Sequence, residues 1–178
     1  MGCTASGEIS PPQKRSSDEE QKIRAWAQGQ CDKHTELRAL HGCGPVELDD
    51  QLCIDAQAWA ERILKKNSLT HADWEQRKHC GENLFMSDGV GTMEVLDDTA
   101  TQCWYDEIAN YNFEDGTCKN DGMIGHFTQI VWKKCTKVGF GYAAGENGTY
   151  ICARYNPAGN ISGNSGHNHY VENVPPLV

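Results

Sequence analysis

The chain has 178 residues, a net charge of −9 and a hydrophobic fraction of 38%, which is typical of one globular domain with a substantial core. No apolar run approaches the roughly 18 residues that a membrane-spanning helix requires. The acidic charge argues against nucleic acid as a partner and opposes non-specific attraction to anionic membranes.

The first residues, MGCTAS, match a signal for N-terminal acylation. Met1, Gly2 and Ser6 fit the myristoylation pattern, and Cys3 beside the acceptor glycine is a natural palmitoylation site. A second acyl chain matters because one myristoyl chain alone attaches a protein only marginally to a membrane. We therefore expect residues 1–16 to form a flexible acylated arm that attaches the protein to the cytoplasmic face of the Golgi or plasma membrane.

The nine cysteines favour a different compartment. High cysteine usage is typical of secreted, oxidised proteins, so secretion is the alternative to acylation. The start of the chain, however, carries no apolar segment of the kind that directs secretion. In a reducing cytosol most of the thiols would be free.

Helical periodicity dominates the first part of a single domain over residues 17–178. Ser17 and Glu20 form a capping-box pattern that begins the first helix, and Gly42 follows its end. The apolar face of this helix comprises Ile23, Trp26, Ala27, Gln30, His34, Leu37 and His41. A second helix ends near Asn67, and its apolar face comprises Leu52, Ala56, Trp59, Ala60, Ile63 and Leu64.

A third helix is expected over about residues 92–110 from the helical spacing of its apolar side chains. Its buried stripe comprises Leu96, Ala100, Cys103 and Trp104. Burial in apolar surroundings disfavours the thiolate, so Cys103 should react slowly.

The later part of the chain has strand patterns. Residues 137–144 and 149–156 are β-type runs around Asn147-Gly148, which is a strong hairpin signal. Residues 128–132 fit either a strand or, with GHFT, a helical turn. A series of helices followed by a hairpin in the later part of the chain predicts an α+β fold.

Glu107 lies three positions after Trp104, which places a carboxylate on the apolar stripe of the third helix. Burying an ionised carboxylate costs several kcal/mol unless it has a partner. The candidate partners are His71 and His126, and Glu82 follows His71 in a loop. Two histidines and two glutamates would suit a divalent metal, and they would equally suit a hydrogen-bonded structural cluster.

Five motifs occur in an order that resembles the CAP superfamily of cysteine-rich secretory, antigen 5 and plant pathogenesis-related proteins. They are LTHAD, CGENLF, CWYDEI, GHFTQIVW and ICARYNPAGN, and the resemblance covers about residues 18–174. It implies a three-layer α–β–α sandwich around a central, mainly antiparallel sheet.

The resemblance also implies a site. His71, Glu82, Glu107 and His126 would line one cleft that holds a divalent cation, zinc above all. The two histidines would be the direct ligands and the glutamates would orient them. Asn160, in the last motif, would be structural.

For function, the resemblance implies a non-enzymatic protein that binds a sterol, a fatty acid or an acidic phospholipid at a membrane surface. The start and the tail are most similar to the membrane-attached cytosolic branch of the superfamily, and a homodimer is implied as well. One alternative is a secreted, disulfide-linked effector or venom-allergen-like protein. Another is a metal-assisted hydrolase or protease in which zinc activates water, although two histidines are a sparse ligand set for that chemistry.

Overall fold

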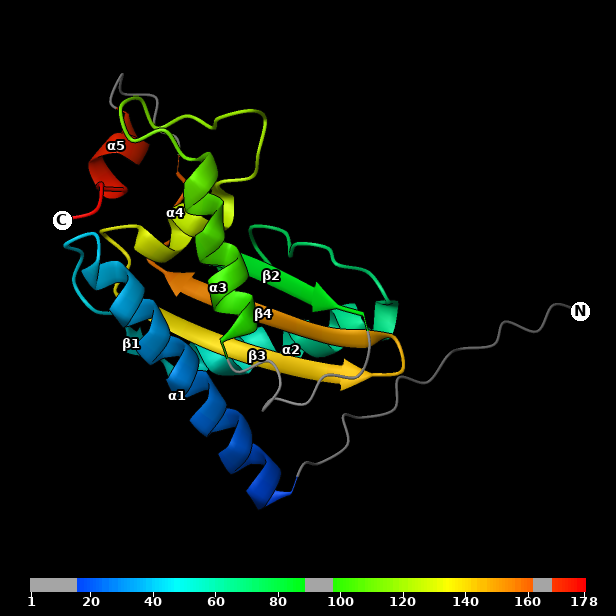
Figure 1. Cartoon of the computed structure of the whole chain (residues 1–178). Helices are drawn as coiled ribbons and strands as arrows, with labels where there is room; N and C mark the ends of the chain where they lie inside the picture. Colours follow the sequence, from blue (N-terminus) through cyan, green and yellow to red (C-terminus); the bar gives the residue numbers. More distant parts are fainter. Residues whose placement is uncertain (1–15, 89–97, 162–167) are drawn as a thin grey trace, which may run out of the picture.

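The computed structural model describes residues 16–88, 98–161 and 168–178. Its elements form three layers, with a sheet between helices on either side (Figure 1). In chain order they are α1 (Ser17–Ala39), β1 (Glu47–Leu48), α2 (Asp50–Lys66), β2 (Gly81–Ser87), α3 (Thr99–Asp106), the 3₁₀ helix η1 (Glu107–Asn110), α4 (Gly125–Val131), β3 (Lys137–Gly145), β4 (Gly148–Asn156) and α5 (His169–Asn173).

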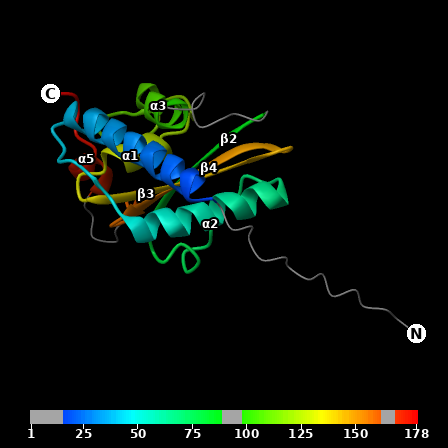
Figure 2. The same ribbon diagram turned by 90° about the horizontal axis from the view of Figure 1, so that it is seen from below.

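The sheet has the strand order β1-β3-β4-β2. Strand β1 runs parallel to β3, whereas β3 with β4 and β4 with β2 are antiparallel. Helix α2 covers one face, and α1, α3 and α4 lie on the other, as the view from below shows (Figure 2). The expected α–β–α sandwich with a mainly antiparallel sheet is thus confirmed. None of the described helices is long and apolar enough to cross a membrane.

Local signals placed the helices α1, α2 and α3 and the two hairpin strands β3 and β4. The expected loop at Glu82 was wrong, because this residue lies in β2. The hairpin is confirmed, since Gly145 pairs with Gly148 across the turn that contains Asn147. Helix α2 ends next to Asn67, as expected, and Asn67 itself is in the left-handed conformation. Helix α1 is capped one residue earlier than predicted, because Ser16 rather than Ser17 accepts a hydrogen bond from the Glu19 backbone N–H.

Of the two interpretations of residues 128–132, the helical one is confirmed, because residues 128–131 belong to the short helix α4. The expected burial of Cys103 was wrong. Cys103 is exposed, since the buried face of α3 is formed by Ala100, Thr101, Trp104 and Tyr105 and a residue at position 103 points away from it. Leu96 and the predicted start of this helix lie outside the described residues. All eight described cysteines are unpaired.

Helix α2 approaches β3 so closely that only glycine fits beneath it. A Cβ atom at Gly141 would lie 2.2 Å from the Gln57 backbone nitrogen, and one at Gly139 would lie 2.3 Å from that of Cys53. The approach lets Gln57 bond the open edge of β3, where its Nε2 donates to Tyr142 O (2.7 Å) and its Oε1 accepts from Tyr142 N (3.0 Å). The helix is thereby fixed on the sheet, and with it the loop that follows.

We expect Gly141→Ala to destabilise the protein by about 1–3 kcal/mol or more, because rigid backbone opposes the added methyl group. Chemical denaturation would measure the free energy of unfolding. Gly29→Ala is the control, since nothing lies within 4 Å of a Cβ at that position in α1; there alanine should stabilise by about 0.5–1 kcal/mol. Equal unfolding free energies for wild type and Gly141→Ala would contradict the close approach.

Candidate functional site

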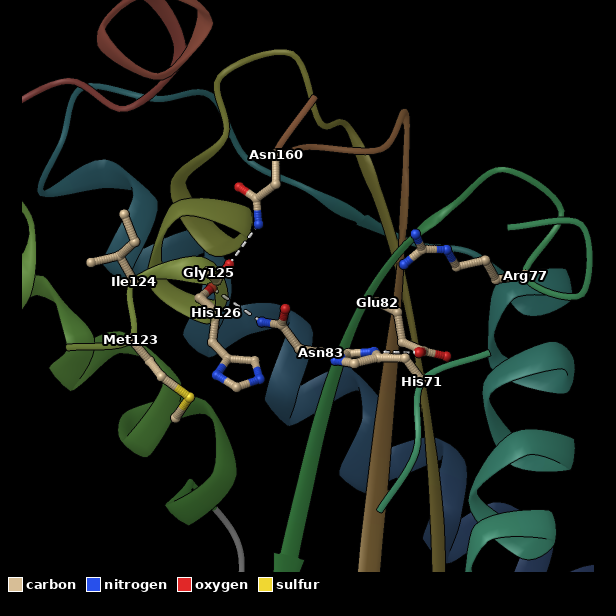
Figure 3. A pocket seen from close by; sticks show the side chains of 9 residues that line it. All are labelled: His71, Arg77, Glu82, Asn83, Met123, Ile124, Gly125, His126 and Asn160. Atoms are coloured by element: carbon tan, nitrogen blue, oxygen red, sulfur yellow. Dashed lines mark hydrogen bonds and ion pairs between the residues drawn. The ribbon is translucent and has the colours of Figure 1, made fainter. Parts of the chain in front are cut away.

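A pocket of about 510 Å³ lies against the start of the edge strand β2 (Figure 3). Side chains from α4, from the loop after α2, from β2 and from the segment after β4 meet there. The lining residues are His71, Arg77, Glu82, Asn83, Met123, Ile124, Gly125, His126 and Asn160.

The edge position of β2 explains how the two outer layers reach one pocket. Successive residues of a strand point to opposite faces. Glu82 is in register with Arg154 and lies on the α2 side, while Asn83 bonds to α4 on the other side. Because β2 has no further strand beyond it among the described residues, groups from both faces can meet around its edge.

The first histidine–carboxylate pair joins the loop after α2 to β2. His71 Nδ1 donates to Glu82 Oε1 at 2.6 Å, and the Ala72 backbone N–H donates to the same oxygen at 3.0 Å. The other oxygen of Glu82 pairs with Arg154 Nη2 at 3.0 Å. The Glu82 side chain has no exposed surface, whereas that of His71 is 56% exposed. A buried carboxylate thus holds an accessible imidazole.

The second pair joins η1 to α4. His126 Nδ1 donates to Glu107 Oε1 at 2.6 Å. The other oxygen of Glu107 accepts from the backbone N–H groups of His126 (2.8 Å) and Phe127 (3.2 Å). Helix α4 has no capping side chain of its own, so Glu107 satisfies these free N–H groups. The same carboxylate therefore caps the helix and orients its histidine.

The two pairs leave the same ring nitrogen available. An ionised carboxylate can only accept a hydrogen bond, so Nδ1 of each histidine carries the proton. In the neutral ring, Nε2 then keeps its lone pair. Within the described parts of the chain, no side chain or backbone group bonds to Nε2 of His71 or His126.

Asn160 has a supporting position at the pocket. Its Nδ2 donates to Gly125 O at 2.7 Å, and its Oδ1 accepts from Thr128 Oγ1 at 2.7 Å. These bonds hold the first turn of α4, which carries His126. The backbone of Asn160 is in the left-handed region, at φ 56°.

The structure therefore places His71, Glu82, His126 and Asn160 at one pocket, with Glu107 behind His126. Gly2 and Cys3 lie outside the described residues. In the ranges that the structure describes, no group of three or more His, Cys, Asp or Glu side chains could hold a metal ion.

Sequence reasoning missed Asn83 and Arg77 in the lining and Arg154 behind it. Asn83 stands inside the CGENLF motif, but its neighbour Glu82 was the more conspicuous residue. Arg154 could have been found from the hairpin, because a buried strand that carries an arginine needs a carboxylate nearby.

The three-layer sandwich, with one histidine–glutamate pair at its edge strand β2 and a second pair between η1 and α4, is a CAP domain. The model of the Cysteine-rich secretory protein family matches residues 31–156, and the chain belongs to this family. It is 38% identical to human Golgi-associated plant pathogenesis-related protein 1, over 80% of this chain and 88% of that protein. It is 33% identical to Arabidopsis thaliana pathogenesis-related protein 1, over 71% of this chain and 73% of that protein.

The fold is also similar to solved structures. The crystal structure of NaASP2 with Zn²⁺ superimposes with a TM-score of 0.62 at 26% sequence identity, and the match covers 86% of each chain. The Zn²⁺ ion is a feature of the NaASP2 structure.

We expect Glu82→Gln to lower the free energy of unfolding by about 3–5 kcal/mol, because it leaves the buried Arg154 charge without its partner. Denaturation at neutral pH would measure the loss. The control is Glu75→Gln, whose side chain is 84% exposed although it pairs with His79; its effect should stay within about 0.5 kcal/mol. Similar effects for both variants would show that the Glu82–Arg154 pair contributes little.

Proposed function

We propose that this protein is a non-enzymatic CAP-domain protein that binds a divalent cation, zinc, through His71 and His126 and binds lipid at a membrane surface. The observation that carries the cation site is the shared arrangement of the two histidines. Each has its Nδ1 bonded to a carboxylate and its Nε2 unbonded beside one pocket.

This arrangement suits a cation because metal-binding histidines commonly donate their second N–H to a carboxylate, which fixes the ring and raises its basicity. Imidazole nitrogen is a preferred zinc ligand. Glu82 and Glu107 orient the rings, and the open positions of the cation would be filled by water or a ligand. The crystal structure of NaASP2 with Zn²⁺, a protein of similar fold, supports the choice of metal.

The membrane part of the proposal rests on the N-terminal sequence and on one surface feature. Gly2 would carry myristate and Cys3 palmitate, which would hold the domain at the cytoplasmic face of the Golgi or plasma membrane. A relative of this chain is named for its Golgi association. Met123, which is 67% exposed at the rim of the pocket, offers apolar surface to a lipid.

We expect the double variant His71→Ala/His126→Ala to lose zinc binding in titration calorimetry, because it removes both proposed nitrogen ligands. His79→Ala is the matched control, since His79 is exposed and bonds to Glu75; it should bind zinc as the wild type does. Wild-type affinity should fall on acidification, because protons compete with the metal for neutral imidazole. Undiminished affinity in the double variant would refute the assignment of the ligands.

The same double variant separates the cation from the lipid. It should still float with vesicles of phosphatidylcholine and phosphatidylserine, because acyl chains and apolar contacts do not require the cation. Loss of vesicle binding in zinc-free buffer would show that the histidines also serve the lipid.

We expect Gly2→Ala to move the protein from the membrane fraction to the soluble fraction of cells. The variant cannot accept myristate, and a single remaining acyl chain would bind it to a membrane only marginally. Thr4→Ala keeps Gly2, Cys3 and Ser6 and should stay on membranes. Intact mass of the protein from its own cells would count the acyl chains. A mass that instead shows disulfides and glycans without myristate would favour the secreted alternative.

A further inference from the structure

We propose that Asn83 is a third functional residue of the pocket, and that His34 and Tyr155 fix its amide so that the oxygen faces the pocket as a hydrogen-bond acceptor. Its ligand would be a water molecule, or an O–H or N–H group, that completes the coordination of the cation. The inference rests on the cation site proposed above and adds a residue to it.

The orientation begins at a backbone carbonyl inside α1. His34 is fully buried, and its Nδ1 lies 2.9 Å from Gln30 O. A carbonyl can only accept, so Nδ1 carries the proton. Burial lowers the pKa of His34 to about 3, so the ring is neutral and its Nε2 is an acceptor. The Tyr155 hydroxyl, 2.9 Å from Nε2, must therefore donate to it.

The direction of the Tyr155 hydrogen bond in turn fixes the orientation of the Asn83 amide. With its proton committed to His34, the Tyr155 oxygen can only accept, and Asn83 Nδ2 donates to it at 3.1 Å. The other N–H of the same amide donates to His126 O, also at 3.1 Å. A flipped amide would place Asn83 Oδ1 against two oxygens that have no proton to offer. The amide therefore has one allowed orientation.

The result is one unbonded oxygen among oxygens that already accept hydrogen bonds. Both oxygens of Glu82 accept from His71, Ala72 or Arg154, and Asn160 Oδ1 accepts from Thr128. Asn83 Oδ1 is the side-chain oxygen of the described pocket lining that has no hydrogen bond.

A zinc ion bound by His71 and His126 would require such a hydrogen-bond acceptor to hold its remaining ligand. Two histidines leave a zinc ion short of the three or four protein ligands that it commonly has, and the described chain offers no further His, Cys, Asp or Glu to complete a set. In Figure 3 Asn83 lies between the side chains of His71 and His126. A fixed acceptor there would hold the remaining ligand in place.

A double-mutant cycle on zinc affinity tests both parts of the inference. Asn83→Ala should weaken zinc binding by about 10-fold or more, as expected for a partner that supports a metal ligand. Tyr155→Phe should also weaken it, because the amide can then turn. In the Asn83→Ala background Tyr155→Phe should have no further effect, since the residue that it positions is gone.

Tyr150→Phe is the matched control. It removes another buried hydroxyl from β4, one that bonds Asn67 on the far face, and should leave zinc affinity unchanged. Additive losses in the cycle, or an affinity of Asn83→Ala within about twofold of wild type, would overturn the inference. Should Asn83→Ala not fold, equal affinities of Tyr155→Phe and Tyr150→Phe would overturn it.

The outcomes separate this inference from the proposed function. A wild-type protein that binds no zinc would refute the cation site and this inference with it. Zinc binding that requires both histidines and is indifferent to Asn83 would refute this inference alone.

Discussion

The buried carboxylate of Glu82 has to be compensated inside the protein, because its side chain has no contact with solvent. Removing such a charge from water costs several kcal/mol unless donors replace the lost hydration. The donors are the backbone of Ala72, the ring of His71 and the guanidinium of Arg154. They come from the loop after α2 and from β4, so compensating one charge fixes the loop, the edge strand and the neighbouring strand relative to one another.

Glu107 meets the same requirement on the opposite side of the sheet with different donors. It accepts from the first turn of α4 and from the ring of His126. In both places a carboxylate that organises the backbone also orients an imidazole. The local fold and the geometry of the pocket therefore depend on the same hydrogen bonds, and a substitution at either glutamate affects both.

The parts of the structure that follow from local signals could be predicted from the sequence. Asn147-Gly148 identified the hairpin, and a carboxylate three positions after Trp104 drew attention to Glu107. Which histidine pairs with which glutamate could not be predicted, because His71 and His126 belong to different layers. Cys103 was misplaced because the buried face of α3 is shifted towards Thr101 and Tyr105. Asn83 was overlooked because Glu82 was expected in a loop, whereas both residues lie in β2; even within a strand, adjacent residues normally serve opposite faces.

Adjacent residues of a strand point to opposite faces, but at the edge of a sheet they can still contribute to one site. Around an interior strand, neighbouring strands keep groups from the two faces apart. Strand β2 is flanked on one side only among the described residues, and part of its open side is covered where Trp104 Nε1 donates to Leu84 O at 3.0 Å. The uncovered start of the strand is where the loop after α2 and the first turn of α4 approach each other. A site that combines Glu82 with Asn83 therefore requires an edge strand, and the strand order provides it.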